Sequence, residues 1–152
     1  VEKGLPILCA GDGLGLWQAG HRDDAGAAFA FAAGRETTFG QAYNVVHEEV
    51  MTWEQYLRRA SKALGKEPKI LYLPADRIVK KDPQRFGGLQ EIFRYHGAYD
   101  NTKIRSVVPE FVHKISFETG AAETLADMKK RGAWKKSEDD PVYGELVREA
   151  GG

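Results

Sequence analysis

Apolar residues occur in short blocks between glycine, proline and capping residues, which predicts short strands separated by helices. Three blocks are typical of buried strands: residues 6–10 (Pro-Ile-Leu-Cys-Ala), 42–46 (Ala-Tyr-Asn-Val-Val) and 69–74 (Lys-Ile-Leu-Tyr-Leu-Pro). A fourth strand is predicted for Leu16 to His21, after the turn Gly11-Asp12-Gly13. Because this turn is tight, we expect the fourth strand to pair with residues 6–10 in a hairpin-like arrangement.

Helical spacing and capping residues predict the helices between these strands. The Ala/Phe-rich stretch 24–33 starts on Asp23 and Asp24, whose carboxylates suit the positive end of a helix dipole, and it stops at Gly34. Thr52 with Gln55 forms a capping-box pattern ahead of a helix over residues 53–64. Further helices are expected around Ile78 and Val79, from Pro83 to Tyr95 with an interruption at Gly87-Gly88, between Asp100 and Pro109, from Ser116 to Lys130, and from Pro141 to Glu149.

These elements predict a mixed α/β fold in which short strands alternate with several helices. The 152 residues suit a single domain, 1–152, with a charged C-terminal tail over 132–152 that carries the last short helix. Lys and Arg together number 22, as do Asp and Glu, so the chain has no net positive charge that would favour binding to nucleic acid. Cys9 is the only cysteine, and no apolar run is long enough to span a bilayer, so we expect a cytoplasmic protein without a membrane partner.

Three patterns suggest chemistry and are better explained by structure. The Gly11-x-Gly13-x-Gly15 cluster precedes a predicted strand rather than a helix, so it is a turn and not a dinucleotide loop. Tyr99-x-x-x-Lys103 has the spacing of a catalytic pair, but it lies in a turn and is expected by chance in this composition. His21 with its acidic neighbours lacks further ligands at metal-binding spacing, so no metal is expected.

The order of glycine turn, strand, His21-x-Asp23-Asp24 and small-residue helix resembles the second half of extended short-chain dehydrogenases/reductases, the NAD(P)-dependent epimerase/dehydratase family. Two later segments keep the family's order: Tyr43-Asn44-Val45 followed by Thr52-Trp53-Glu54, and Asp100 to Lys103 followed by Val108-Pro109-Glu110-Phe111. Together the matches span about residues 4–126. The chain therefore resembles the substrate-binding portion of an extended Rossmann-type enzyme.

The resemblance implies an N-terminal Rossmann half outside this chain, which would bind NAD or NADP and carry the catalytic residues. The chain itself would then hold no cofactor and no catalytic residue, and it would be inactive alone. The implied substrate is a small carbohydrate-like molecule, with nucleotide-sugars among the candidates, and the full-length enzyme could form a homodimer. A non-enzymatic protein that binds RNA or a protein partner on the same scaffold is the alternative, and residues upstream of Val1 would distinguish the two.

Five residues are candidates for substrate binding: Trp17, Gln18, Arg94, Tyr95 and His96. Many sugar-nucleotide enzymes of the family place an arginine four residues before the histidine, where it can hold a diphosphate; Trp17 occupies that position here. Trp17 can pack over a sugar ring or belong to the core, and residues 94–96 suit either polar recognition or an exposed helix end. We expect Trp17 and residues 94–96 to face one shared cleft.

Overall fold

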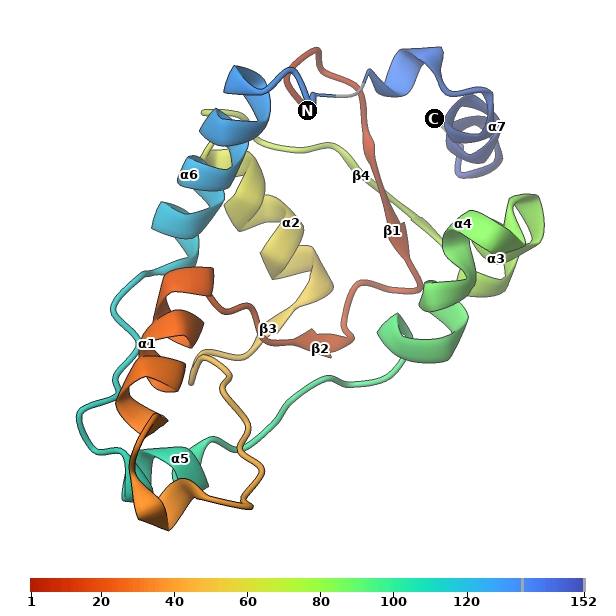
Figure 1. Ribbon diagram of the computed structural model, residues 1–152. Coiled ribbons are helices and arrows are strands. Elements are labelled where there is room, and N and C mark those ends of the chain that lie inside the picture. The colour runs from red at the N-terminus through yellow and green to blue at the C-terminus, as the bar shows by residue number, and fades with distance from the viewer. Residues whose placement is uncertain (135, 152) are drawn as a thin grey trace.

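The computed structural model, which describes residues 1–134 and 136–151, has two separate hydrophobic cores. Around the first core lie α1 (Arg22–Ala32) and α5 (Thr102–Val107), with Ala28, Ile104, Val108 and Phe111 buried between them. The second core holds Leu73, Ile78 and Leu146. Figure 1 shows these as two lobes, with α1 and α5 in one and α3, α4 and α7 in the other.

The described residues form two short pairs of strands. In the second lobe, β1 (Ile7–Ala10) lies parallel to β4 (Ile70–Leu73), with Ile7 opposite Ile70 and Ala10 opposite Leu73. Between the lobes, β2 (Leu16–Trp17) runs antiparallel to β3 (Met51–Thr52). The second lobe is completed by α3 (Ala75–Lys81), α4 (Pro83–Gly88), a π-helical turn (Leu89–Phe93) and α7 (Pro141–Glu149).

Two longer helices, α2 (Trp53–Lys62) and α6 (Phe117–Lys130), pack against each other beside the strands. The capping box predicted for α2 is confirmed: the Gln55 N–H donates to Thr52 Oγ1, and the Gln55 side chain accepts from the Thr52 N–H. Ser116 caps α6 through the Thr119 N–H. Short 3₁₀ turns at Glu36–Thr38 and Ser137–Asp139 complete the order of elements. Within the described residues, no helix has both the length and the apolar content needed to cross a membrane.

Most predicted elements are confirmed, including the mixed fold class and the last helix in the charged tail. Lys135 and Gly152, which belong to that predicted tail, lie outside the described residues. The prediction of a hairpin between residues 6–10 and 16–21 is wrong. The strand after the turn is only two residues long, and it pairs with β3, whereas β1 pairs with β4.

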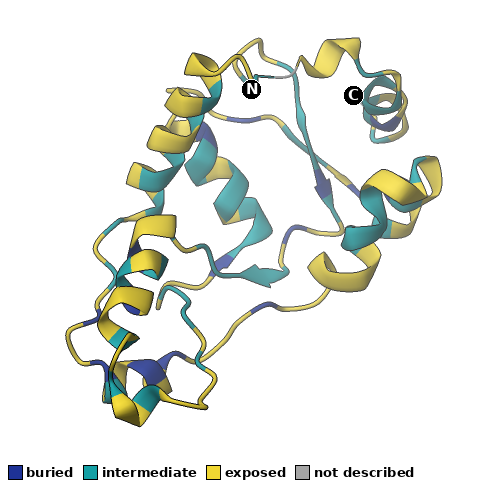
Figure 2. Ribbon diagram, in the orientation of Figure 1, coloured by how far each residue is buried: buried dark blue, intermediate teal, exposed yellow. Residues whose placement is uncertain are grey.

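Two further predictions are corrected. Residues 42–46 form no strand, because no other strand among the described residues lies beside them to complete a ladder. The first helix begins at Arg22, two residues earlier than expected, because His21 caps it: its Nδ1 accepts a hydrogen bond from the Asp23 N–H at 3.2 Å. Figure 2 shows that much of this helix, α1, is exposed.

Candidate substrate-binding site

Residues 96 and 97 lie directly against β2, about eighty residues away in the sequence. The Leu16 N–H donates to His96 Nδ1 at 3.1 Å, and the Gly97 N–H donates to the Leu16 carbonyl at 2.8 Å. These bonds occupy the edge of β2 that faces away from β3. The structure therefore brings Trp17 and His96, two of the predicted site residues, into one neighbourhood.

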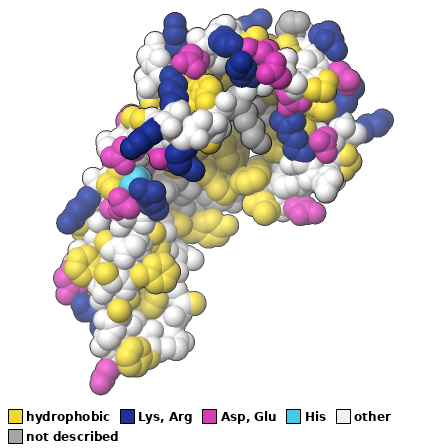
Figure 3. Space-filling view, turned by 45° about the horizontal axis from the view of Figure 1, so that its top comes forward, with side chains coloured by type: hydrophobic (Ala, Val, Ile, Leu, Met, Phe, Trp, Pro, Cys, Tyr) yellow, Lys and Arg dark blue, Asp and Glu magenta, His cyan; other side chains and the backbone are white. Residues whose placement is uncertain are grey.

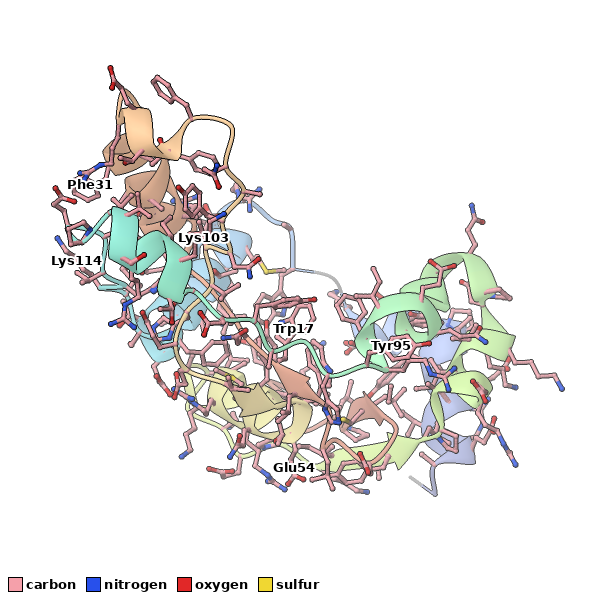
Figure 4. All side chains as sticks on the ribbon, turned by 90° about the horizontal axis from the view of Figure 1, so that it is seen from below. Trp17, Phe31, Glu54, Tyr95, Lys103 and Lys114 are labelled. Atoms are coloured by element: carbon pink, nitrogen blue, oxygen red, sulfur yellow. The ribbon has the colours of Figure 1, made fainter. Side chains whose placement is uncertain are left out.

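Trp17 lies in an aromatic cluster at the meeting point of the two lobes (Figure 4). It stacks on Trp53, with ring centroids 5.1 Å apart, and meets the edge of Phe93 at 5.2 Å. The Gly97 backbone covers part of the ring as well, since a Cβ at that position would lie 2.9 Å from Trp17 Cε3. We call Trp17, Trp53 and Phe93 the aromatic junction. Trp17 is half-buried, so its exposed edge is the part that a ligand can reach.

Gln18 connects two loops that flank the aromatic junction. Its Nε2 donates to the carbonyls of His47, at 2.8 Å, and Tyr99, at 3.2 Å, while its Oε1 accepts from the Tyr99 N–H at 2.6 Å. The amide thus has partners for both of its polar atoms within the protein. This arrangement assigns Gln18 to holding the loops in place.

Arg94 and Tyr95 are exposed where the π-helical turn ends. The Arg94 guanidinium lies 5.7 Å from the centroid of the Tyr95 ring, a cation–π distance. Tyr95 is 61% exposed and Tyr99 is 59% exposed, so both phenol groups are available from solvent. The structure therefore places a cation and two phenols at the surface, with Arg94 and Tyr95 directly following Phe93 of the aromatic junction in the sequence.

A polar cluster that the sequence did not reveal lies beyond Gln18. His113 Nδ1 is 3.1 Å from Glu48 Oε2, and Asn101 Nδ2 donates to Glu48 Oε1 at 3.0 Å. Burial raises the pKa of Glu48, but hydrogen bonds, including those from Asn101 and His113, outweigh this effect and bring it below its usual value. The carboxylate is therefore charged at neutral pH, and it fixes the loop that contains His47. Only long-range contacts define this cluster, so no local motif could have predicted it.

The remaining reactive side chains have structural partners. Lys103 Nζ donates to Gln41 Oε1 at 3.0 Å and to the Ala42 carbonyl at 3.1 Å, so it is not aimed at Tyr99 as a catalytic lysine would be. His21 caps α1, and its Nε2 lies 3.3 Å from Glu123 Oε2. Burial, together with Glu54 and Asp12, raises the pKa of the Cys9 thiol to about 11. Cys9 is thus a protonated core residue and no nucleophile at neutral pH.

Two hollows lie away from the aromatic junction. One, of about 620 Å³, is bounded by the N-terminal residues, β1 and α7, and its walls include Leu5, Phe86 and Trp134. The other, of about 550 Å³, lies between α2, α6 and His21. Neither contains any of the five predicted site residues. Figure 3 shows hydrophobic side chains gathered in the hollowed middle of one face.

Comparison with solved structures identifies the fold. A dTDP-glucose 4,6-dehydratase from Bacillus anthracis, in complex with NAD, superposes with a TM-score of 0.63 at 21% identity, over 87% of this chain and 37% of its own. A UDP-glucose 4-epimerase from Thermotoga maritima, with UDP-glucose, superposes with a TM-score of 0.62 at 20% identity, over 86% of this chain and 37% of its own. A UDP-glucuronic acid 4-epimerase from Bacillus cereus, in complex with UDP-glucuronic acid and NAD, superposes with a TM-score of 0.62 at 14% identity, over 84% of this chain and 36% of its own.

The chain therefore shares the fold of a part of these dehydratase and epimerase structures. This confirms the fold that the sequence resemblance implied. Among curated proteins, a 2'-dehydrokanamycin reductase from Streptomyces kanamyceticus is 30% identical over 112 residues, which are 73% of this chain and 31% of that protein. No protein-family model matches the chain. The chain thus spans about a third of the length of the dehydratase, of the epimerases and of this reductase.

Proposed function

We propose that this chain is the substrate-binding part of an NAD(P)-dependent enzyme of the epimerase/dehydratase type, acting on a carbohydrate-like substrate. The observation that carries the proposal is the fold shared with part of a sugar-nucleotide dehydratase and of two epimerases. The sequence resemblance implies that this part is the substrate-binding portion. The names of the matched proteins support a sugar or aminoglycoside derivative as the substrate class. Their NAD complexes support NAD as the cofactor of the complete enzyme.

The proposed site is the exposed edge of the aromatic junction together with Arg94, Tyr95 and His96. Aromatic edges and faces contact the apolar C–H surface of a sugar ring, while guanidinium, phenol and imidazole groups bond its hydroxyls. His96 uses Nδ1 to accept from Leu16, so only Nε2 is available to a ligand. Gln18 positions the site through the loops that it bonds. This chain then binds and orients the substrate, and the proton and hydride transfers belong to the other half of the enzyme.

The tryptophan at position 17 affects which substrates this site is expected to prefer. A tryptophan cannot donate a bidentate pair of hydrogen bonds to a diphosphate, as an arginine can. Stacked between Trp53 and Gly97, Trp17 also has no room to turn away. We therefore expect glycosides without a nucleotide diphosphate to bind at least as well as nucleotide-sugars do.

Ligand titration tests the site. We expect kanamycin or UDP-glucose to change the tryptophan fluorescence of the chain, since Trp17 and Trp53 are stacked at the proposed site. Arg94→Ala and Tyr95→Ala should each weaken the binding of the better ligand by about tenfold, the worth of one good polar contact. Arg22→Ala is the matched control, because the Arg22 side chain is 87% exposed on α1. Equal affinities for all three variants, or no binding of either ligand, would contradict the proposed site.

This 152-residue chain is not expected to bind NAD(H) or NADP(H) on its own. Dinucleotide sites place the pyrophosphate at a helix N-terminus behind a glycine loop, whereas the glycine turn here joins β1 to β2. Isothermal titration calorimetry with both cofactors should show no heat of binding at micromolar concentrations. Binding of either cofactor at a defined site with micromolar affinity would place the cofactor site within these 152 residues. That result would overturn the proposal that the cofactor binds to the other half of the enzyme.

A further inference from the structure

The indole N–H of Trp53 is a buried hydrogen-bond donor without an acceptor. Its Nε1 atom is closed off from solvent and has no hydrogen-bond partner within the described residues. Aromatic rings surround the indole: Trp17 stacks on it with centroids 5.1 Å apart, and Tyr56 and Phe93 meet it edge-on at 5.4 and 5.6 Å. A buried tryptophan N–H normally has a partner, because an unpaired donor costs free energy. A ligand that supplies an acceptor here therefore gains a hydrogen bond that the free protein lacks.

Gly15 leaves space beside this N–H. A Cβ at Gly15 would lie 3.2 Å from Trp53 Cδ1 and 3.7 Å from Nε1, and within the described part of the chain it would meet no other atom closer than 4 Å except those of its chain neighbours. The φ of Gly15 is not positive, so its backbone conformation does not require glycine. The Gly15 N–H also donates to no acceptor among the described residues. Two donors thus border a space that an alanine side chain would fill.

Polar side chains that follow the aromatic junction in the sequence also donate. His96 Nδ1 accepts from the Leu16 N–H at 3.1 Å, so the neutral imidazole carries its proton on Nε2 and donates to a ligand. The Arg94 guanidinium has N–H groups only and no acceptor atom. Only Tyr95, with its hydroxyl group, can both donate and accept among the groups that we assign to the site. The proposed site is therefore rich in donors.

The acceptors that flank the aromatic junction are bonded within the protein. Gln18 Oε1 accepts from the Tyr99 N–H at 2.6 Å. Glu54, the residue after the buried indole, accepts from Arg58 Nε at 2.8 Å. Hydrogen bonds from Arg58 and from Tyr72 lower the pKa of Glu54, so its carboxylate is charged and paired at neutral pH. These two acceptors are therefore not available to hold a cationic ligand.

We propose that the aromatic junction recognises sugars through their oxygen atoms, with the Trp53 N–H donating to a hydroxyl, carbonyl or ring oxygen that enters beside Gly15. This inference rests on the proposed function and narrows its substrate class to neutral and acidic glycosides. An ammonium group has donors only, so in place of that oxygen it leaves the Trp53 N–H and its own N–H groups unpaired. The positive charge of Arg94 adds repulsion. The site therefore rejects amino sugars that carry the ammonium group at the recognised position.

Nuclear magnetic resonance of the nitrogen-15-labelled chain tests the proposal, because each of the three tryptophans gives one indole N–H signal. The spectrum of Trp53→Phe assigns the Trp53 signal. Methyl glucoside should move this signal downfield and saturably, as the N–H gains an acceptor. Methyl glucosides with an amine in place of the hydroxyl on the second, third or sixth carbon are the matched probes, and at least one should bind about tenfold more weakly. Equal or tighter binding of every amino sugar would overturn the proposal.

Gly15→Ala, with Gly20→Ala as its matched control, tests the space beside the indole. The new methyl group occupies the position that the sugar oxygen enters, so the affinity for methyl glucoside should fall about tenfold, and the ligand should no longer move the Trp53 signal. No atom lies within 4 Å of a Cβ at Gly20, so Gly20→Ala should bind as the parent does.

Trp53→Phe gives a second reading, which does not depend on whether Gly15→Ala folds. Phenylalanine keeps an aromatic ring but has no N–H, so methyl glucoside and its amino analogues should bind this variant with similar affinities. Unchanged discrimination between them in Trp53→Phe would contradict a role for the indole N–H.

Three further results separate this inference from the proposed function. Methyl glucoside that moves the signals of residues 94–96 but not the Trp53 indole signal would overturn the inference and leave the site in place. No binding of any probe would overturn both. Glu91 is the carboxylate nearest to Phe93 in the sequence. Amino sugars that bind more tightly than methyl glucoside, and lose this advantage in Glu91→Gln, would show a cation-binding site and contradict the proposal.

Discussion

Replacing Asp24 with alanine is expected to lower the free energy of unfolding by about 2–3 kcal/mol, the cost of leaving buried donors without their charged acceptor. Asp24 is only 4% exposed, and its two carboxylate oxygens accept the N–H groups of Lys114 and Ile115, both at 3.1 Å. These bonds join α1 to the segment that leads into α6, ninety residues later in the sequence. Urea unfolding followed by circular dichroism gives the change directly.

Asp23→Ala is the control for this prediction. The Asp23 side chain is 64% exposed, although it belongs to the same helical turn, so its loss should change stability by less than about 0.5 kcal/mol. If the two aspartates contributed only to the helix dipole, the two variants would be equally stable. That result would show that the hydrogen bonds between Asp24 of α1 and residues 114–115 do not stabilise the protein.

Gly97→Ala is expected to destabilise the protein by about 1–3 kcal/mol through overpacking. The new methyl group would lie 2.9 Å from Trp17 Cε3 and 3.0 Å from Cζ3. Trp17 cannot move away without losing its stacking on Trp53. We therefore expect a lower melting temperature together with a changed near-ultraviolet circular dichroism spectrum, because the tryptophan rings must shift.

Gly20→Ala provides the comparison for Gly97→Ala. No atom lies within 4 Å of a Cβ at Gly20, and its φ is not in the left-handed region, so alanine should be neutral or slightly stabilising. A Gly97→Ala variant with the stability and spectrum of the parent would show that the contact between Trp17 and residue 97 is loose. The aromatic junction would then be too mobile to orient a substrate.

The sequence predicted elements well where the determining residues are near neighbours. Thr52 and Gln55 cap α2, and Ser116 with Thr119 caps α6, through bonds that span three residues. The turn at Gly11 and Gly13 is likewise local, since both residues have a positive φ of 72° and 77°. The family resemblance, which rests on the order of such segments, correctly predicted a fold shared with part of the dehydratase and epimerase structures.

Sequence patterns could not determine which strands pair or what each site residue touches. The alternation of Tyr43 and Val45 reads as a strand, but a strand needs a partner, and none of the described strands lies beside it. Asp24 suits a helix start by composition, yet its oxygens bind a segment ninety residues away.

By itself, then, the sequence determined the caps of α2 and α6, the glycine turns and the order of helices, because these depend on hydrogen bonds between residues a few positions apart. Only the tertiary structure decided that β1 pairs with β4, that His96 and Gly97 bond Leu16, and that Trp17 stacks on Trp53. Each of these contacts joins segments separated by tens of residues. Their formation depends on how the two cores pack in three dimensions, a property that no local window of the sequence contains.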